Sequence, residues 1–429
     1  MAVGVLFGVL VLCLILRVPI GISLGLSSLA TIFASGVVQP TYMSQTLVTG
    51  CDSFPLMAVP FFILAGELMA TGGISKRLLN IADAFLGRQY GGLAQVTIVA
   101  CMFFAAISGS GPATVAAIGG LTIPTMVKQG YDVGYSGAIS AAAGSIGVVI
   151  PPSIPMVMYA VASGASVGAM FLGGIVPGLI IGGSLMLYTK FYCTKRHYIN
   201  KEAPAFSWKT VIHSLVDGIW ALMVPVIILG GIYGGIFTPT EAAAVAVAYG
   251  IIVGLFVYRD LKLKDLFNIF GNAALTTATI MIILGTANTF GRILTLQRIP
   301  TMIASFFQSI TDSRIVILLL INLLLLFVGC FMETNAAIII LAPIFLPIVQ
   351  SMGVDPVHFG VIMVINLAIG FVTPPLGVNL FVATNVANTK LGVICKGIMP
   401  IIGVMIVDLL LFTYLEPLVM FLPRMVYGG

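Results

Sequence analysis

The chain contains one stretch twice. Residues 108–177 align with residues 331–400 without a gap, at a shift of 223 positions (347 − 124). Most of the coinciding residues are Gly and Pro, which fix the shape of the backbone. We therefore expect two copies of one structural unit, and weak internal symmetry of this kind is typical of secondary transporters. The identities pair Pro124 with Pro347, Gly130 with Gly353, Asp132 with Asp355, Gly137 with Gly360, Gly147 with Gly370, Pro151 and Pro152 with Pro374 and Pro375, and Pro177 with Pro400.

The composition places both copies in a membrane. Of the 429 residues, 59% are apolar and only 8% are charged, whereas a soluble domain carries roughly a quarter charged residues. Lipid cannot satisfy free backbone groups, so we expect spanning helices of about 20 apolar residues each. The predicted fold is an all-α polytopic membrane protein with two inverted repeats, about 11 spans and two re-entrant hairpins, arranged as a transport domain and a scaffold.

The first 90 residues are predicted to form scaffold helices of the first repeat. Residues 2–37 are too long for one span, so we expect a break at Arg17-Val18-Pro19. No charged region precedes this segment and no cleavage site is evident, which favours a retained span over a signal peptide. Residues 74–89 have apolar residues at helical spacing with charges on the other side. This pattern predicts an interfacial helix, which either anchors the protein at the bilayer surface or braces it against a partner.

Each repeat is then predicted to contain a transport unit. The first, residues 91–178, should hold a hairpin with its tip at 108–112 and a helix broken at 145–153. The second, residues 312–400, should hold a tip at 332–335 and a break at 370–376. Residues 179–311 are interpreted as a linker with the second set of scaffold helices, and residues 401–429 as a C-terminal span.

The linker has two further features. Its most basic part, 190–209, is placed in the cytoplasm because positive charge gathers on that side of a membrane. Residues 259–270 are predicted to be a second interfacial helix, followed by a separate span that ends near Phe290. Thr238, Pro239 and Glu241 match a capping box, which gives Glu241 a structural explanation beside a transport role.

The two breaks are candidate cation sites. Proline has no N–H, so the first Pro pair is predicted to leave the carbonyls of Gly147 and Val148 unpaired, and the second pair those of Gly370 and Phe371. A buried unpaired carbonyl costs on the order of a few kcal/mol. Sodium is a hard cation that takes oxygen ligands. The alternative is a pair of ordinary kinked helices whose Ser and Thr side chains satisfy the backbone. The candidate sodium ligands are Ser108, Ser110, Ser145, Gly147 and Val148 in the first copy, and Thr334, Asn335, Gly370, Phe371 and Thr373 in the second.

Few charged residues are candidates for substrate contacts. Arg292 either pairs with a substrate carboxylate or lies at a helix end with its head in water. Glu333 stands beside the second tip, and Glu67 lies within an apolar run, where a buried structural hydrogen bond is the alternative. The candidate substrate-binding set is Arg292, Glu333, Pro152 and Pro375.

Several classes of protein are disfavoured. No Gly-Lys dipeptide occurs, so the chain has no phosphate-binding loop and is not expected to be an ATPase. The six Cys are scattered without a CxxC or a neighbouring His, which favours core packing over disulfides or metal ligation. The His and Asp residues lie mostly in loops, which argues against an intramembrane protease. The net charge of +5 indicates a membrane-side bias and not a nucleic-acid surface.

The stretches PFFILAGELM, SGSGPATVAAIGG, GSIGVVIPPSI, GIFTPTEAAAVAVAYG, DPVHFGVIMVINLAIGFVTPPLGVNLF and GIMPI resemble the large membrane subunit of tripartite ATP-independent periplasmic (TRAP) transporters. The resemblance runs essentially end to end. It implies a multi-pass protein of the bacterial inner membrane that takes up an organic acid by a sodium-coupled elevator mechanism. It also implies two partners, a periplasmic substrate-binding protein and a small membrane subunit, which we expect to be a separate chain.

The resemblance maps the family's sodium sites onto Ser108, Ser110, Gly147, Thr334, Asn335, Gly370 and Thr373. Many members have Asp where this chain has Glu333. The substrate class is either sialic acid or C4-dicarboxylates. The alternatives to a tripartite system are a stand-alone sodium/dicarboxylate symporter of related architecture and a passive channel.

Overall fold

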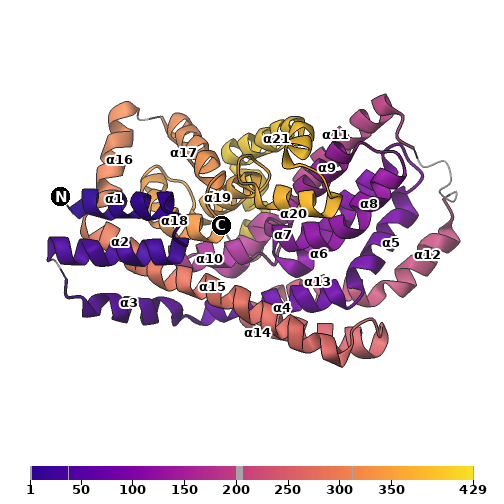
Figure 1. Cartoon of the computed structure of the whole chain (residues 1–429), viewed down its shortest axis with the longest axis horizontal. Helices are drawn as coiled ribbons and strands as arrows, with labels where there is room; N and C mark the ends of the chain where they lie inside the picture. The colour runs from indigo at the N-terminus through magenta and orange to yellow at the C-terminus, as the bar shows by residue number, and fades with distance from the viewer. Residues whose placement is uncertain (1, 37, 200–205, 312, 429) are drawn as a thin grey trace.

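The computed structural model describes residues 2–36, 38–199, 206–311 and 313–428, and these residues form helices joined by short connections. The first three helices of the chain lie along the long axis of the molecule, and others run obliquely or across it (Figure 1). Six of the described helices are long and apolar enough to cross a membrane, or seven if the bent pair α12–α13 counts as one span. Eight shorter apolar helices have 10–17 residues. The all-helical membrane fold predicted from the composition is confirmed.

The first scaffold helices are α1 (Ala2–Ile15), α2 (Ile20–Ser35), α3 (Thr41–Cys51), the 3₁₀ turn η1 (Phe54–Met57), α4 (Ala58–Thr71) and α5 (Ile74–Leu86). The predicted break after α1 is confirmed. Arg17 adopts a left-handed backbone with φ of 60°, and Pro19 precedes the first residue of α2. The chain therefore reverses, and α1 packs against α2.

Helix α5 confirms the amphipathic helix expected within residues 74–89, and it packs on the protein itself. Its apolar side lies against α6, and α12 also contacts it. Arg77 on this helix forms an ion pair, in which Arg77 Nη1 lies 2.6 Å from Asp260 Oδ2. The Arg77 guanidinium also lies 3.6 Å from the ring centre of Tyr258. These contacts tie the first-repeat scaffold to the connection that precedes α15.

The segment predicted to be the first transport unit contains α6 (Gly92–Ser108), α7 (Gly111–Thr114), the π-helical turn η2 (Val115–Gly119), α8 (Gly120–Lys128), α9 (Val133–Ser145), the 3₁₀ turn η3 (Ile146–Val148) and α10 (Ile154–Ser163). The second contains α17 (Arg314–Gly329), α18 (Thr334–Ser351), α19 (Pro356–Gly370) and α20 (Val378–Ala387). Helix α9 ends at Ser145 before α10 begins at Ile154, and α19 ends at Gly370 before α20 begins at Val378. The second tip lies at 330–333, slightly before the predicted 332–335, because the Glu333 side chain caps α18 and the helix begins at Thr334.

The two repeats interlock at their broken helices. The second half of the first broken helix, α10, packs on α18 and α19 of the second repeat. The second half of the other broken helix, α20, packs on α9, η2 and α8 of the first repeat. Figure 1 shows both crossings near the centre of the molecule. Each hairpin is therefore closed by a helix that belongs to the other repeat.

The remaining helices are α11 (Val167–Arg196), α12 (Trp208–Asp217), α13 (Ile219–Tyr233), α14 (Pro239–Ile252), the π-helical turn η4 (Val253–Val257), α15 (Leu263–Leu296), α16 (Ile299–Ile310), α21 (Leu391–Tyr414) and α22 (Glu416–Tyr427). The capping box at α14 is confirmed: Glu241 N–H donates to Thr238 Oγ1 at 3.3 Å, and Thr238 N–H donates to Glu241 Oε2 at 2.8 Å. Part of the basic linker, 200–205, lies outside the described residues.

Helix α15 corrects one prediction. The expected interfacial helix at 259–270 and the span after it form a single helix of 34 residues, about 51 Å long at 1.5 Å per residue. No Pro occurs between Leu263 and Leu296, and the single Gly271 near the junction does not interrupt the hydrogen-bond ladder. The result is one continuous helix that packs against α2, α3 and α4 and against α18 of the second repeat.

Candidate functional site

The two tips and the two breaks meet at one cavity of about 910 Å³. The first tip contributes residues 108–113, the second contributes Glu333 and Asn335, and Val148 and Phe371 come from the breaks. The opposite wall belongs to the scaffold, with Glu67 on α4 and the middle of α15. A mostly apolar cavity with a few polar groups at one side is the usual form of a small-molecule site. The lining residues on α15 are Leu275, Thr276, Thr279, Ile280 and Ile283.

Hydroxyl groups organise the first tip. Ser108 is buried, and its Oγ lies 3.0 Å from Thr114 Oγ1. Thr114 Oγ1 lies 2.7 Å from the Ser110 carbonyl oxygen, to which it donates a hydrogen bond. Gly109 adopts a positive φ of 61°, which a residue with a side chain rarely does, and this lets the chain turn at the tip.

Gly147 brings the first break against this tip. A Cβ at position 147 would lie 2.5 Å from Thr114 Oγ1 and 2.8 Å from the Ser110 carbonyl oxygen, both too close for a real side chain. Only glycine allows this approach. The predicted residues Ser108, Ser110 and Gly147 are therefore together in space, with Thr114 among them.

At the second tip, Glu333 acts as a helix cap. Its carboxylate accepts a hydrogen bond from the Ala336 N–H at 3.0 Å and another from Asn335 Nδ2 at 2.7 Å. The side-chain nitrogen of Asn335 faces the carboxylate, so the side-chain oxygen Oδ1 of Asn335 points away from it. That oxygen is buried and has no hydrogen-bond partner among the described residues. Asn335 thus presents an oxygen that lacks a donor.

The prediction of unpaired carbonyls is wrong at three of its four positions. The Val148 carbonyl accepts a hydrogen bond from Ser153 Oγ at 2.6 Å. The Gly370 carbonyl accepts one from Thr373 N–H at 3.2 Å, and the Phe371 carbonyl accepts one from Asn379 N–H at 3.1 Å. Ser153 and Asn379 follow the Pro pairs and Thr373 directly precedes one, so residues within or just beyond each break supply the donors. Each carbonyl oxygen keeps a second lone pair, so these positions remain predictions as sodium ligands.

Two predicted hydroxyl ligands bond to their own helices. Ser145 Oγ donates to the Ala142 carbonyl at 2.7 Å, and Thr373 Oγ1 donates to the Ile369 carbonyl at 2.7 Å. A hydroxyl that has donated its hydrogen still presents two lone pairs to a cation. Thr334 is buried in the first turn of α18, beside Asn335.

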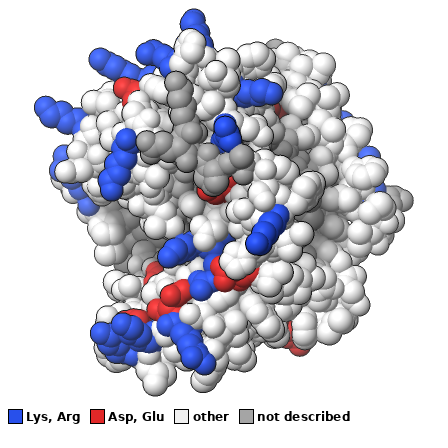
Figure 2. Space-filling model, turned by 90° about the vertical axis from the view of Figure 1, so that its right-hand side faces the viewer, with Lys and Arg blue, Asp and Glu red and all other residues white. Residues whose placement is uncertain are grey.

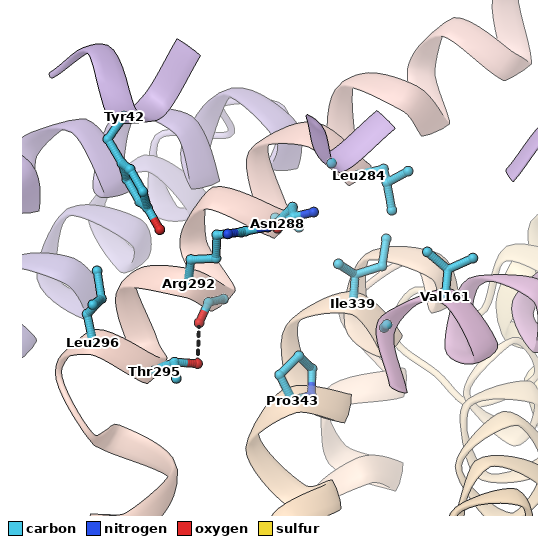
Figure 3. A pocket seen from close by; sticks show the side chains of 13 residues that line it. Tyr42, Val161, Leu284, Asn288, Arg292, Thr295, Leu296, Ile339 and Pro343 are labelled. Atoms are coloured by element: carbon cyan, nitrogen blue, oxygen red, sulfur yellow. Dashed lines mark hydrogen bonds between the residues drawn. The ribbon is translucent and has the colours of Figure 1, made fainter. Parts of the chain in front are cut away.

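Arg292 lines a second cavity of about 440 Å³ (Figure 3), and no residue of either tip is among the residues that line it. Its Nε donates to Asn288 Oδ1 at 3.2 Å, and both residues belong to α15. Tyr42, Val161, Ile339 and Pro343 line the same cavity from other helices. The structure therefore separates Arg292 from Glu333, although the sequence prediction grouped them.

The two candidate prolines also lie outside the first cavity's lining. Pro152 is buried. Its carbonyl oxygen lies 2.7 Å from the position that a Cβ of Gly109 would take, so Pro152 packs directly against the first tip. Pro375 is exposed. Of the acidic candidates, Glu67 and Glu333 both line the first cavity.

Sequence reasoning missed two residues at this site. Thr114 lies four positions after Ser110, and a Thr side chain often donates a hydrogen bond to the carbonyl four residues earlier in a helix. This spacing could therefore have identified Thr114 from the sequence. Asn379 is fully buried beside the first tip, although it follows the second break. Met156 occupies the matching position in the first copy, so the duplication gave no signal for Asn379.

No group of three or more His, Cys, Asp or Glu side chains that could hold a metal ion occurs within the described ranges. The polar groups at the tips are hydroxyl and carbonyl oxygens together with the Glu333 carboxylate, and an oxygen set of this kind suits a hard cation such as sodium.

The chain was compared with known proteins. Residues 7–418 match the family model described as "Tripartite ATP-independent periplasmic transporter, DctM component". The chain is 55% identical to the isethionate TRAP transporter permease protein DctMQ of Oleidesulfovibrio alaskensis over 97% of this chain, and it spans 66% of that protein's length. It is 42% identical to the C4-dicarboxylate TRAP transporter large permease protein DctM of Vibrio cholerae, with 100% and 99% of the two chains covered.

A further relative is the sialic acid TRAP transporter large permease protein SiaM of Vibrio cholerae, which is 38% identical, with 99% of each chain covered. Among solved structures, the Alcanivorax borkumensis YdaH transporter matches with a TM-score of 0.56 and 16% identity. The match covers 91% of this chain and 89% of the other, and it supports the fold alone. With the family model matching nearly the whole chain, this protein belongs to the DctM family, the large permease component of tripartite ATP-independent periplasmic transporters.

Proposed function

We propose that this chain is the inner-membrane permease through which a small organic anion is taken up with sodium ions. One observation carries the proposal: two hairpin tips and two broken helices, related by the internal duplication, meet at a single cavity of about 910 Å³. The tips bring buried oxygen atoms to that cavity. One of them is the side-chain oxygen Oδ1 of Asn335, which accepts no hydrogen bond from any described residue. A duplicated pair of discontinuous helices around one central site is the usual architecture of ion-coupled transporters.

Sodium would bind at two places in this arrangement. At the first, Ser108, Ser110 and Thr114 offer hydroxyl and carbonyl oxygens beside Gly147. At the second, Asn335 and Thr373 offer oxygens near the tip and the break. One charge that moves through 100 mV releases about 2.3 kcal/mol, and a tenfold gradient adds about 1.4 kcal/mol. Two ions would therefore supply roughly 7 kcal/mol, and no nucleotide is needed.

Glu333 is assigned a positioning role. Its carboxylate caps α18 and holds the Asn335 amide, so both of its oxygens already accept hydrogen bonds. A second negative charge from the substrate would be repelled by a free carboxylate, whereas bound sodium beside the cavity would attract it. Arg292 would act earlier on the path, by drawing the anion into the second cavity, whose walls share α15 with the first.

The relatives indicate the substrate class. Their names give isethionate, C4-dicarboxylates and sialic acid, which are all organic acids. We propose that a periplasmic binding protein delivers a substrate of this class and that a small membrane subunit completes the transporter. The relative that is longer than this chain carries the name DctMQ.

The charge distribution supports an orientation. Lys and Arg gather at the end of the molecule formed by α5, α8 and α12 (Figure 2). Positive residues accumulate on the cytoplasmic side of a membrane, so we assign this end to the cytoplasm. Uptake would then proceed by an elevator movement, in which the interlocked units α6–α10 and α17–α20 slide along α15.

Uptake into proteoliposomes tests the proposal. The chain would be reconstituted with its small subunit, and the binding protein would be added outside. Isethionate, succinate and sialic acid would each be offered with an inward sodium gradient and with choline in its place. Uptake that needs both sodium and the binding protein is the expected result. Sodium-driven uptake that ignores the binding protein would replace the tripartite proposal with a stand-alone symporter, and uptake that ignores sodium would refute the coupling.

A further inference from the structure

Asn379 stands where the two repeats cross. It belongs to the first turn of α20, and its side chain is fully buried. Its backbone N–H donates to the Phe371 carbonyl at 3.1 Å, across the second break. Its side-chain nitrogen donates to the Ala141 carbonyl on α9 at 3.1 Å, which belongs to the first repeat. One residue therefore contacts the broken helices of both repeats.

The hydrogen bond to Ala141 fixes the orientation of the amide. A carbonyl can only accept, so the NH₂ group must face Ala141 and Oδ1 must face the opposite way. Oδ1 has no hydrogen-bond partner among the residues that the structure describes. A buried amide oxygen without a donor is unfavourable, so a group with positive charge or a hydrogen must satisfy it.

The surroundings of Oδ1 point to the first tip. A Cβ at Gly111 would lie 3.2 Å from Asn379 Oδ1, 3.3 Å from Asn379 Nδ2 and 3.2 Å from the Phe371 ring, so the side-chain amide of Asn379 lies against the first tip. Gly111 directly follows Ser110, whose carbonyl oxygen lies against Gly147. The neighbours of the amide on this side are thus the Gly111 backbone and the Phe371 ring, and Gly111 is joined directly to the Ser110 carbonyl. No hydrogen-bond donor to Oδ1 occurs among the described residues, and a bound cation would satisfy this oxygen.

We propose that Asn379 Oδ1 is a ligand of the sodium ion held at the first tip, so that this ion is coordinated by both repeats. The inference rests on the proposed sodium coupling. It adds to the first sodium site a ligand residue, Asn379, whose matching position in the first copy is Met156. It implies that the first sodium ion binds only when α20 of the second repeat is in place against α7 and α9. Binding of that ion would then lock the crossing of the two repeats.

The test is sodium-dependent thermal stabilisation of the purified full-length chain in detergent. NaCl would be titrated against choline chloride at constant ionic strength, because a ligand that binds only the folded state raises the melting temperature with concentration. The variants are Asn379→Leu, which removes the oxygen, and Asn379→Asp, which keeps an oxygen but loses the donor to Ala141. Asn385→Leu is the matched control, since Asn385 is an exposed asparagine on the same helix.

We expect Asn379→Leu to raise the half-saturating sodium concentration at least about fivefold, while Asn379→Asp and Asn385→Leu stay within about twofold of the wild type. Equal losses in the Leu and Asp variants would show that the bond to Ala141 matters and would overturn the inference. A wild-type response in Asn379→Leu would also overturn it, with sodium coupling intact. Absence of any sodium-specific response in the wild type would instead refute sodium coupling itself.

Discussion

Gly370 offers a direct test of the contact between the second break and the second hairpin. A Cβ at this position would lie 2.4 Å from the Gly329 carbonyl oxygen and 2.7 Å from the Gly329 Cα. Ordinary contact begins at 3.4 Å, so the two backbones would have to part by about 1.0 Å (3.4 − 2.4). Neither partner is a side chain that can rotate away. Gly370→Ala therefore forces either strain or separation.

The size of the effect follows from overpacking, which costs typically 1–3 kcal/mol. Gly329 ends α17 and leads directly into the tip that carries Glu333, so separation displaces Asn335 relative to Thr373. If the whole cost falls on ion binding, the half-saturating sodium concentration rises roughly 5- to 150-fold. If part of it remains as strain, the melting temperature falls as well.

The assay measures the initial uptake rate against sodium concentration in proteoliposomes, with the melting temperature measured in parallel. Gly403→Ala is the matched control, because Gly403 lies within α21 and a Cβ there meets nothing within 4 Å. Replacing a helical Gly by Ala at such a site should stabilise by about 0.5–1 kcal/mol. If Gly370→Ala matched Gly403→Ala in both sodium dependence and melting temperature, the reasoning from this contact would be refuted.

Three further predictions concern other parts of the molecule. Ser110→Ala together with Thr373→Ala should weaken the sodium dependence of uptake more than it lowers expression, and an unchanged sodium response would show that the sites are misplaced. Arg292→Lys keeps the charge but loses the planar Nε contact to Asn288. The variant should raise the substrate concentration for half-maximal uptake, and an unchanged value would remove Arg292 from the path. Thr238→Ala removes the cap of α14, which should cost about 0.5–2 kcal/mol of stability; thermal melting should detect the loss while sodium dependence stays constant.

Local chemistry explains what the sequence predicted well. Pro19, the two Pro pairs and Gly109 act on the backbone within a few residues, so the helix breaks and the first tip appear where those residues stand. The capping box at Thr238 and Glu241 is likewise a contact across three positions. The internal duplication located the second break by the same rules, because it repeats those local signals.

Contacts between distant residues explain what the sequence could not predict. The bond from Asn379 to Ala141 joins residues 238 positions apart, and no periodic pattern marks either end. Arg292 was grouped with Glu333 because both are rare intramembrane charges, yet the position of each depends on how α15 packs. The carbonyls of Val148 and Phe371 were predicted to be unpaired because their donors, Ser153 Oγ and Asn379 N–H, come from outside the helix turn that proline interrupts.

The interlocking of the repeats has a consequence for biosynthesis. Helix α10 ends at Ser163 and packs on α18, which ends at Ser351, so 188 residues (351 − 163) must follow before its partner exists. At about 5–20 residues per second, the ribosome needs roughly 10 to 40 s to supply them. During that interval the first break has been inserted without the helices that close it. A nascent chain stalled before α18 should therefore expose the first tip to water-soluble thiol reagents through a cysteine placed at Ser110, and this exposure should disappear once α20 has been made.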